Sequence, residues 1–115
     1  MTRNVVVTGA AGFIGRWVVY ELLSQGHEVV GLDNLSNGSE RNIAAFRDDD
    51  SFTFVKGDVR DEGSVNDLVS QDTDAVLHLA AEIDVQESLD DPESHFETNV
   101  AGTHNVLEAC RRTDT

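Results

Sequence analysis

The sequence predicts an α/β fold in which parallel strands alternate with helices. Short apolar segments rich in valine recur along the 115 residues, and each is followed by a segment with turn or helical character. A glycine-rich turn, Gly9 to Gly15, joins the first such strand to the first helix. No linker, internal repeat or low-complexity segment interrupts the pattern, so residues 1–115 are expected to form one domain with a modest core.

Four strands are predicted from runs of apolar and β-branched residues bounded by turn residues. In chain order they cover Arg3 to Thr8, Glu28 to Leu32, Phe52 to Lys56 and Ala75 to Ala80. The fourth has almost no polar alternation, as expected for a parallel strand covered on both faces. Right-handed crossovers between them predict a doubly wound parallel sheet in the order 3-2-1-4.

The first helix is expected over Phe13 to Gln25, before Gly26. Its predicted inward face consists of apolar residues at helical spacing, namely Ile14, Val18 and Leu22. A short helix should follow Gly38 and Ser39 and end near Phe46.

Two acidic residues predict later helix starts. Asp61 is expected to cap a helix that runs to Val69, because its carboxylate can accept free N–H groups of the first turn. Asp91 and Pro92 open the last helix, with proline at the first helical position. The predicted inward stripe of that helix is Phe96, Val100, Thr103, Leu107 and Cys110. The lone cysteine is interpreted as a small buried hydrophobe.

The glycine-rich turn predicts a phosphate-binding site. Without side chains at Gly9, Gly12 and Gly15, a pyrophosphate can approach the backbone N–H groups at the helix N-terminus. The spacing differs from the standard G-x-G-x-x-G motif, so the context decides its meaning. The second strand ends on Asp33, eighteen residues after Gly15, where a ribose-binding acid belongs. Together these features favour a Rossmann-type dinucleotide site.

The carboxyl ends of the four strands should meet in one crevice. These ends are Thr8 to Gly12, Asp33-Asn34, Asp58-Val59 and Ala80-Ala81. The Asp33 carboxylate can accept hydrogen bonds from both ribose hydroxyls and would repel a 2′-phosphate, so NAD is favoured over NADP. The alternative is a surface acid that ends a strand. Arg16 could meet a phosphate near this turn or remain a solvated first-turn residue.

The histidines give no metal-site pattern, because none has a histidine or cysteine at ligand spacing. His78 lies inside the fourth strand, where a hydrogen-bonded core histidine is favoured over a catalytic one.

Charge restricts the partners. The net charge is −14, from 22 acidic and 8 basic residues, which argues against nucleic acid as a partner. No apolar run is long enough for a membrane span, and no signal peptide is recognisable, so a cytoplasmic protein is expected. With one lysine among its basic residues, the composition also resembles that of halophilic proteins, and we expect molar salt to stabilise the fold by screening self-repulsion.

Five ordered motifs resemble the extended short-chain dehydrogenase/reductase family. They are Thr8-Gly9-Ala10-Ala11-Gly12-Phe13-Ile14-Gly15, Leu32-Asp33-Asn34-Leu35-Ser36-Asn37-Gly38, Gly57-Asp58-Val59, His78-Leu79-Ala80-Ala81 and Thr98-Asn99-Val100-Ala101-Gly102-Thr103. The resemblance covers residues 3–111. Within the family, the second motif and the segment Ala80 to Pro92 are most similar to NAD-dependent nucleotide-sugar epimerases of the UDP-glucose 4-epimerase type.

The resemblance implies a role for each matching residue. It implies contacts with the pyrophosphate for Gly9, Gly12, Phe13 and Ile14 beside Gly15, and with the adenosine ribose for Asp33 and Asn34, with Ser36, Asn37 and Gly38 close by. It implies that Asp58 and Val59 flank the adenine, that Leu79, Ala80 and Ala81 approach the nicotinamide ribose, and that Asn99 steadies the nearby backbone.

In these epimerases, nicotinamide takes hydride from sugar C4 and returns it to the opposite face of a 4-keto intermediate. A Tyr-x-x-x-Lys pair provides the base. This chain lacks such a pair: its one tyrosine is Tyr20, and its one lysine is Lys56. The resemblance therefore implies the cofactor-binding part, truncated relative to the family, without the catalytic and sugar-binding part.

Three interpretations remain open. The chain is the cofactor-binding half of a nucleotide-sugar epimerase or of a related 4,6-dehydratase, whose substrate would be of the UDP-glucose or UDP-galactose class. Alternatively, it is an NAD-binding protein without catalysis, or an assembly partner whose last helix packs on another subunit in a homo-oligomer. In each case the fourth strand, Ala75 to Ala80, is expected to leave an open apolar edge and to favour self-association.

Overall fold

The computed structural model describes all of residues 1–115 and contains one parallel sheet. Its strands are β1 (Asn4–Thr8), β2 (Glu28–Asp33), β3 (Phe52–Lys56) and β4 (Ala75–His78). They are ordered β3-β2-β1-β4, and every neighbouring pair is parallel. The predicted fold class and strand order are therefore confirmed.

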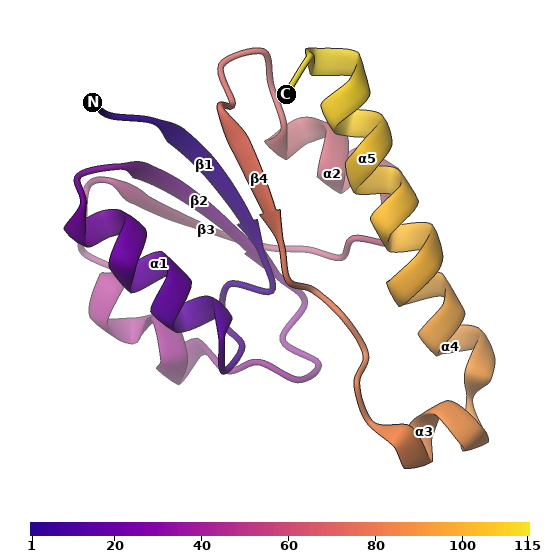
Figure 1. Ribbon diagram of the computed structural model, residues 1–115. Coiled ribbons are helices and arrows are strands. Elements are labelled where there is room, and N and C mark those ends of the chain that lie inside the picture. Colours follow the sequence, from indigo (N-terminus) through magenta and orange to yellow (C-terminus); the bar gives the residue numbers. More distant parts are fainter.

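Helices cover both faces of the sheet (Figure 1). One face carries α1 (Gly15–Ser24) and the 3₁₀-helix η1 (Glu40–Phe46), and the other carries α2 (Glu62–Leu68) and α5 (Gly102–Thr113). After β4 the chain forms α3 (Val85–Asp90), α4 (Pro92–Phe96) and the π-helical segment η2 (Glu97–Ala101), which continues into α5. No helix has the length and apolar character needed to cross a bilayer.

Each face of the sheet has its own apolar core. On the side of α1, the buried cluster includes Val7, Val19, Val29, Ile43 and Phe52. On the side of α5, it includes Leu32, Val59, Val65, Val106 and Ala109. Both cores draw residues from the central strands, so they hold the carboxyl ends of β1 and β2 in fixed positions.

The predicted helix starts are confirmed by their capping hydrogen bonds. Asp61 accepts from the N–H groups of Gly63 and Ser64 at the start of α2. Asp91 accepts from the Ser94 N–H, and Pro92 occupies the first turn of α4. Each carboxylate satisfies a donor that the helix itself leaves free. The short helix α3, which Asp84 caps through the Glu87 N–H, was not predicted.

The predicted inward face of the first helix is partly wrong. The helix begins at Gly15 rather than Phe13, and Ile14 is 64% exposed. Gly15 and Val19 are the buried residues of α1, while Val18 and Leu22 only border the core. The reason is a close approach between α1 and the preceding turn: a Cβ at Gly15 would overlap the Gly9 carbonyl oxygen. The smallest residue therefore faces inward.

The predicted stripe of the last helix is also partly wrong: Cys110 packs against the core as predicted, but the large apolar residues do not. Phe96, Val100 and Leu107 are more than half exposed. The buried residues are instead Thr98 in η2 and Gly102, Val106 and Ala109 in α5. A Cβ at Gly102 would lie 2.6 Å from Val59 Cγ2. The helix lies so close to the segment before α2 that small residues form the contact face. Each buried residue of α5 directly precedes a residue of the predicted stripe, so the contact face is rotated by about one residue around the helix axis.

Strand β4 is shorter and less covered than predicted. It ends at His78, and just beyond its end the Leu79 and Ala80 N–H groups donate to Thr8 Oγ1. Val76 packs into the core beside α5, whereas Leu77 and Leu79 are 38% and 39% exposed. One face of the strand is therefore open, contrary to the prediction that both are covered. Its position at an edge of the sheet agrees with the prediction.

Candidate functional site

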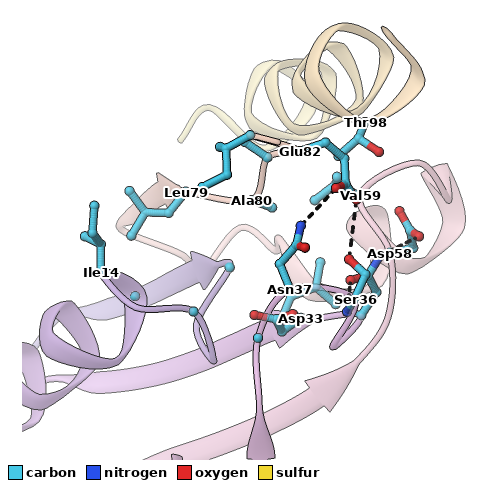
Figure 2. A pocket seen from close by; sticks show the side chains of 18 of the residues that line it. Ile14, Asp33, Ser36, Asn37, Asp58, Val59, Leu79, Ala80, Glu82 and Thr98 are labelled. Carbon is cyan, nitrogen blue, oxygen red and sulfur yellow. Dashed lines mark hydrogen bonds between the residues drawn. The ribbon is translucent and has the colours of Figure 1, made fainter. Parts of the chain in front are cut away.

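A pocket of about 350 Å³ lies at the carboxyl ends of the strands (Figure 2). Its walls come from the turn after β1, the segments after β2 and β3, and the loop after β4. All residues that the sequence singled out for a cofactor line this pocket, with the exception of Asn99. The volume lies within the range typical of small-molecule sites.

The turn after β1 brings bare backbone to the pocket. Gly9 has a φ of +72°, and a Cβ there would lie 2.9 Å from the Ala80 nitrogen. Gly12 donates its N–H to the Gly9 carbonyl at 3.1 Å, which closes the turn. Larger residues at Gly9 or Gly15 would push the turn away from β4 and α1. This tightly closed turn, at the start of α1, has the form of an anion cradle.

Asp33 is fixed at the end of β2. Its Oδ2 accepts from the Ala11 N–H at 2.9 Å, and its Oδ1 accepts from the Leu35 N–H at 2.8 Å. The residue is 8% exposed and lines the pocket. Each carboxylate oxygen retains acceptor capacity beyond its one backbone bond. A Cβ at Gly38 would lie 2.9 Å from Asp33 Oδ2, so that glycine keeps the space beside the carboxylate open.

Asp58, just after the end of β3, is held in its ionised form by hydrogen bonds. Arg60 donates to both of its carboxylate oxygens, with a shortest distance of 2.7 Å, and Asn34 Nδ2 donates to Oδ2 at 3.0 Å. Hydrogen bonding from the Arg60 side chain lowers the pKa of Asp58 to about 2. The carboxylate is thus ionised at neutral pH and links the segments after β2 and β3.

Glu82 connects opposite walls of the pocket and was not predicted. Its Oε2 accepts from Asn37 Nδ2 at 2.9 Å, and its Oε1 accepts from Ser36 Oγ at 3.4 Å (Figure 2). Asn99 holds its backbone through two bonds, accepting from the Glu82 N–H at 2.8 Å and donating to the Glu82 carbonyl at 2.9 Å. Asn99 thus steadies the pocket wall without lining it.

His78 forms a bridge inside the fold. Its Nδ1 lies 2.6 Å from Thr8 Oγ1, and its Nε2 lies 2.9 Å from Thr103 Oγ1. Burial lowers the pKa of His78 below its ordinary value, so the ring is neutral at pH 7. The ring does not line the pocket. These contacts agree with the interpretation of a hydrogen-bonded core histidine.

Arg16 lies outside the pocket lining. Its Nη1 donates to Asn42 Oδ1 at 3.0 Å, and its guanidinium stacks between the rings of Phe13 and Trp17 at 5.2 and 5.1 Å from their centroids. Arg16 is thus held by Asn42 and two aromatic rings rather than standing as a free, solvated residue of the first turn. The pocket residues missed by sequence reasoning are Leu32, Gly57, Glu82, Ile83 and Thr98.

The fold and this site together define a class of protein: a doubly wound α/β domain whose glycine turn and strand-end acid accommodate a dinucleotide. A family model described as GDP-mannose 4,6 dehydratase matches residues 6–115. The chain belongs to this family, the NAD-dependent nucleotide-sugar epimerases and dehydratases, and corresponds to their N-terminal portion.

Individual relatives include both activities. The UDP-glucose 4-epimerase of Mycolicibacterium smegmatis is 45% identical, over 94% of this chain and 34% of that protein. The low-salt glycan biosynthesis protein Agl12 of Haloferax volcanii is 42% identical, over 96% of this chain and 36% of that protein. The dTDP-glucose 4,6-dehydratase DesIV of Streptomyces venezuelae, solved with NAD and TYD bound, has a TM-score of 0.90 and 35% identity, over 97% and 37% of the two chains. This chain therefore spans about a third of the length of its relatives.

Proposed function

We propose that residues 1–115 are the NAD-binding domain of a nucleotide-sugar epimerase of the UDP-glucose 4-epimerase type. The observation that carries the proposal is the pocket in which the glycine turn faces Asp33 across the carboxyl ends of β1 and β2. The turn offers backbone donors to the pyrophosphate, and Asp33 offers acceptors to the adenosine ribose. The NAD present in the structure of the related dehydratase supports this assignment.

The remaining pocket residues are assigned to the adenosine at one wall and to the nicotinamide ribose at the other. Asn34 and Asp58 are joined by a hydrogen bond and line the part of the pocket assigned to the adenosine. Leu79, Ala80 and Ala81 form the opposite wall, where the nicotinamide ribose would lie. Apolar and small residues there leave the backbone accessible, which suits a flat ring next to a sugar.

When bound, NAD supplies the oxidising step, because it accepts hydride from sugar C4 and returns it. Residues of this chain hold and orient the dinucleotide for that step. They do not provide the base: Tyr20 is 52% exposed on α1 and packs near Trp17 and Phe46, away from the pocket lining. Residues 1–115 contain no Tyr-x-x-x-Lys pair, so the proposal assigns them the cofactor and not the base.

A 4,6-dehydratase is the second candidate. The matching family model carries that activity in its name, and the related DesIV structure is a dehydratase. Both reactions begin with oxidation at sugar C4, so both need the same cofactor site. The chain is 45% identical to the M. smegmatis epimerase and 35% identical to DesIV, and this difference favours epimerisation.

Substitution of Asp33 tests the cofactor assignment. Asp33→Asn keeps the side-chain shape and removes the charge, and we expect NAD binding to weaken by about 10- to 100-fold, the value of a charge-assisted hydrogen bond. The same variant should discriminate less between NAD and NADP, because the repulsion of the 2′-phosphate is gone.

The matched control is Asp50→Asn, which removes one charge from a loop outside the pocket. Calorimetric titration of both variants in molar KCl, with circular dichroism to check folding, makes the comparison. Equal NAD affinity for a folded Asp33→Asn variant and the control would contradict the role of Asp33. Tighter binding of NADP than NAD by the unaltered chain would contradict the choice of cofactor.

A further inference from the structure

Three side chains with metal-ligating atoms meet beside the cofactor pocket. Glu82 lies in the loop after β4, Glu87 lies in α3, and His95 lies in α4. Their carboxylate oxygens and imidazole nitrogen all lie within 4.8 Å of one another. Figure 1 shows that α3 and α4 form a tight corner after the loop, which is why residues apart in sequence converge.

The imidazole of His95 lacks a hydrogen-bond partner at this corner. The His95 side chain is 12% exposed, and its Nε2 is buried with no donor or acceptor in range. The nearest carboxylate oxygen, Glu87 Oε2, lies at 3.9 Å, which is too far for a hydrogen bond. Buried polar atoms are nearly always paired, so an orphaned one marks a place for a missing ion or water.

Glu82 is already held in position from its other side. Asn37 donates to its Oε2, Ser36 donates to its Oε1, and Asn99 fixes its backbone. Each carboxylate oxygen can accept a second interaction beyond these bonds. Hydrogen bonds of this kind orient a carboxylate ligand and reduce the cost of binding an ion.

We propose that Glu82, Glu87 and His95 bind one divalent transition-metal cation of the Zn²⁺ type at the rim of the pocket. One imidazole and two carboxylates form a ligand set that suits zinc, and water would occupy the fourth position. Ligand distances of about 2.0–2.2 Å place tetrahedral ligand atoms roughly 3.3–3.6 Å apart, so groups that now lie within 4.8 Å of one another must close by up to about 1.5 Å. The Glu87 side chain is 61% exposed and can make most of that movement. The three groups lie together in the structure without any bound dinucleotide.

Titration calorimetry with ZnCl₂ on the 115-residue chain tests the site. We expect one saturable site per chain, and at least about tenfold weaker binding in His95→Ala and in Glu87→Gln, since each loses a ligand. The matched control for His95→Ala is His104→Ala, because His104 is exposed on α5 and is not part of the cluster. Circular dichroism identifies variants that fail to fold, and the exposed position of Glu87 makes Glu87→Gln the variant that decides in that case.

Competition with Mg²⁺ separates the proposed site from the acidic surface. Zn²⁺ that is bound by an imidazole should remain bound in a large excess of Mg²⁺. Zn²⁺ that is bound by carboxylates alone should be displaced by Mg²⁺. Retention of bound Zn²⁺ would support the proposal. Complete displacement by Mg²⁺, or equal Zn²⁺ affinity in His95→Ala and His104→Ala, would overturn it.

Discussion

At the scale of single residues, backbone position explains which site residues could be predicted. The glycines of the first turn and Asp33 follow strands whose ends are visible in the sequence, so their convergence follows from parallel topology. Glu82 could not be predicted in the same way. Its carboxylate reaches Asn37 only because Asn99 holds the loop after β4 from a helix seventeen residues away. A polar loop residue has no periodicity that reveals such a contact.

The pH dependence of stability should report the environment of His78. Burial lowers its pKa from the ordinary 6.5, so the unfolded chain binds the proton at higher pH than the folded chain. The free energy of unfolding should therefore fall as pH drops below about 6.5, because the unfolded chain takes up a proton that the folded chain resists. Urea denaturation between pH 7.5 and 5.5 should give a smaller slope for His78→Gln than for the unaltered chain.

The control for this measurement is His104→Gln, which changes an exposed histidine of α5. This variant should keep the pH slope of the unaltered chain. If His78→Gln and the unaltered chain had equal slopes, burial would not lower the pKa of His78 in the folded chain.

At the scale of elements, caps could be predicted better than helix faces. Asp61 and Asp91 mark helix starts through local hydrogen bonds, which depend on a few neighbouring residues. The faces of α1 and α5 depend on how closely each helix approaches its neighbours. At both contacts glycine faces inward, at Gly15 and Gly102, and this reverses the rule that the largest apolar residues are buried.

Adjacent residues of α5 should therefore differ in their effect on stability. Val106→Ala removes buried methyl groups from the core and should lower the free energy of unfolding by about 1–3 kcal/mol. Leu107→Gln should change it by less than about 0.5 kcal/mol, because the side chain is 63% exposed. Urea denaturation of the two variants measures both changes; a larger loss for Leu107→Gln would restore the predicted stripe.

At the scale of the whole molecule, charge and uncovered apolar surface oppose one another. The net charge of −14 repels other copies at low salt and destabilises the compact state. Four large apolar side chains remain exposed: Leu77 on β4, Leu79 just after it, Phe96 on α4 and Leu107 on α5. Screening of the charge should therefore stabilise the fold and also favour association through these surfaces.

A salt series tests this balance. Between about 0.1 M and 2 M KCl the Debye length shortens from roughly 10 Å to under 3 Å, and we expect the melting temperature to rise by at least about 5 °C. Light scattering across protein concentrations in high salt should show self-association. An unchanged melting temperature would argue against salt adaptation. A monomer at every protein concentration would argue against self-association through the exposed edge of β4.

The strand order was predictable because right-handed crossovers leave few arrangements for four parallel strands. The extent of cover over β4 was not, since it depends on how closely the elements that follow an edge strand pack against it. That edge leaves the pocket itself complete on the adenosine side, where Asp33, Asn34 and Asp58 are already fixed by hydrogen bonds within the chain. Cofactor binding should therefore be measurable with these residues alone.

Calorimetric titration of the unaltered chain with NAD in molar KCl examines that expectation without any substitution. We expect saturable binding of one NAD per chain, because the glycine turn and Asp33 lie in one pocket and are joined by a hydrogen bond. Binding should be weaker for NADP, whose 2′-phosphate meets the Asp33 carboxylate. A folded chain that gives no saturable heat with NAD would contradict the assignment of this pocket as a dinucleotide site.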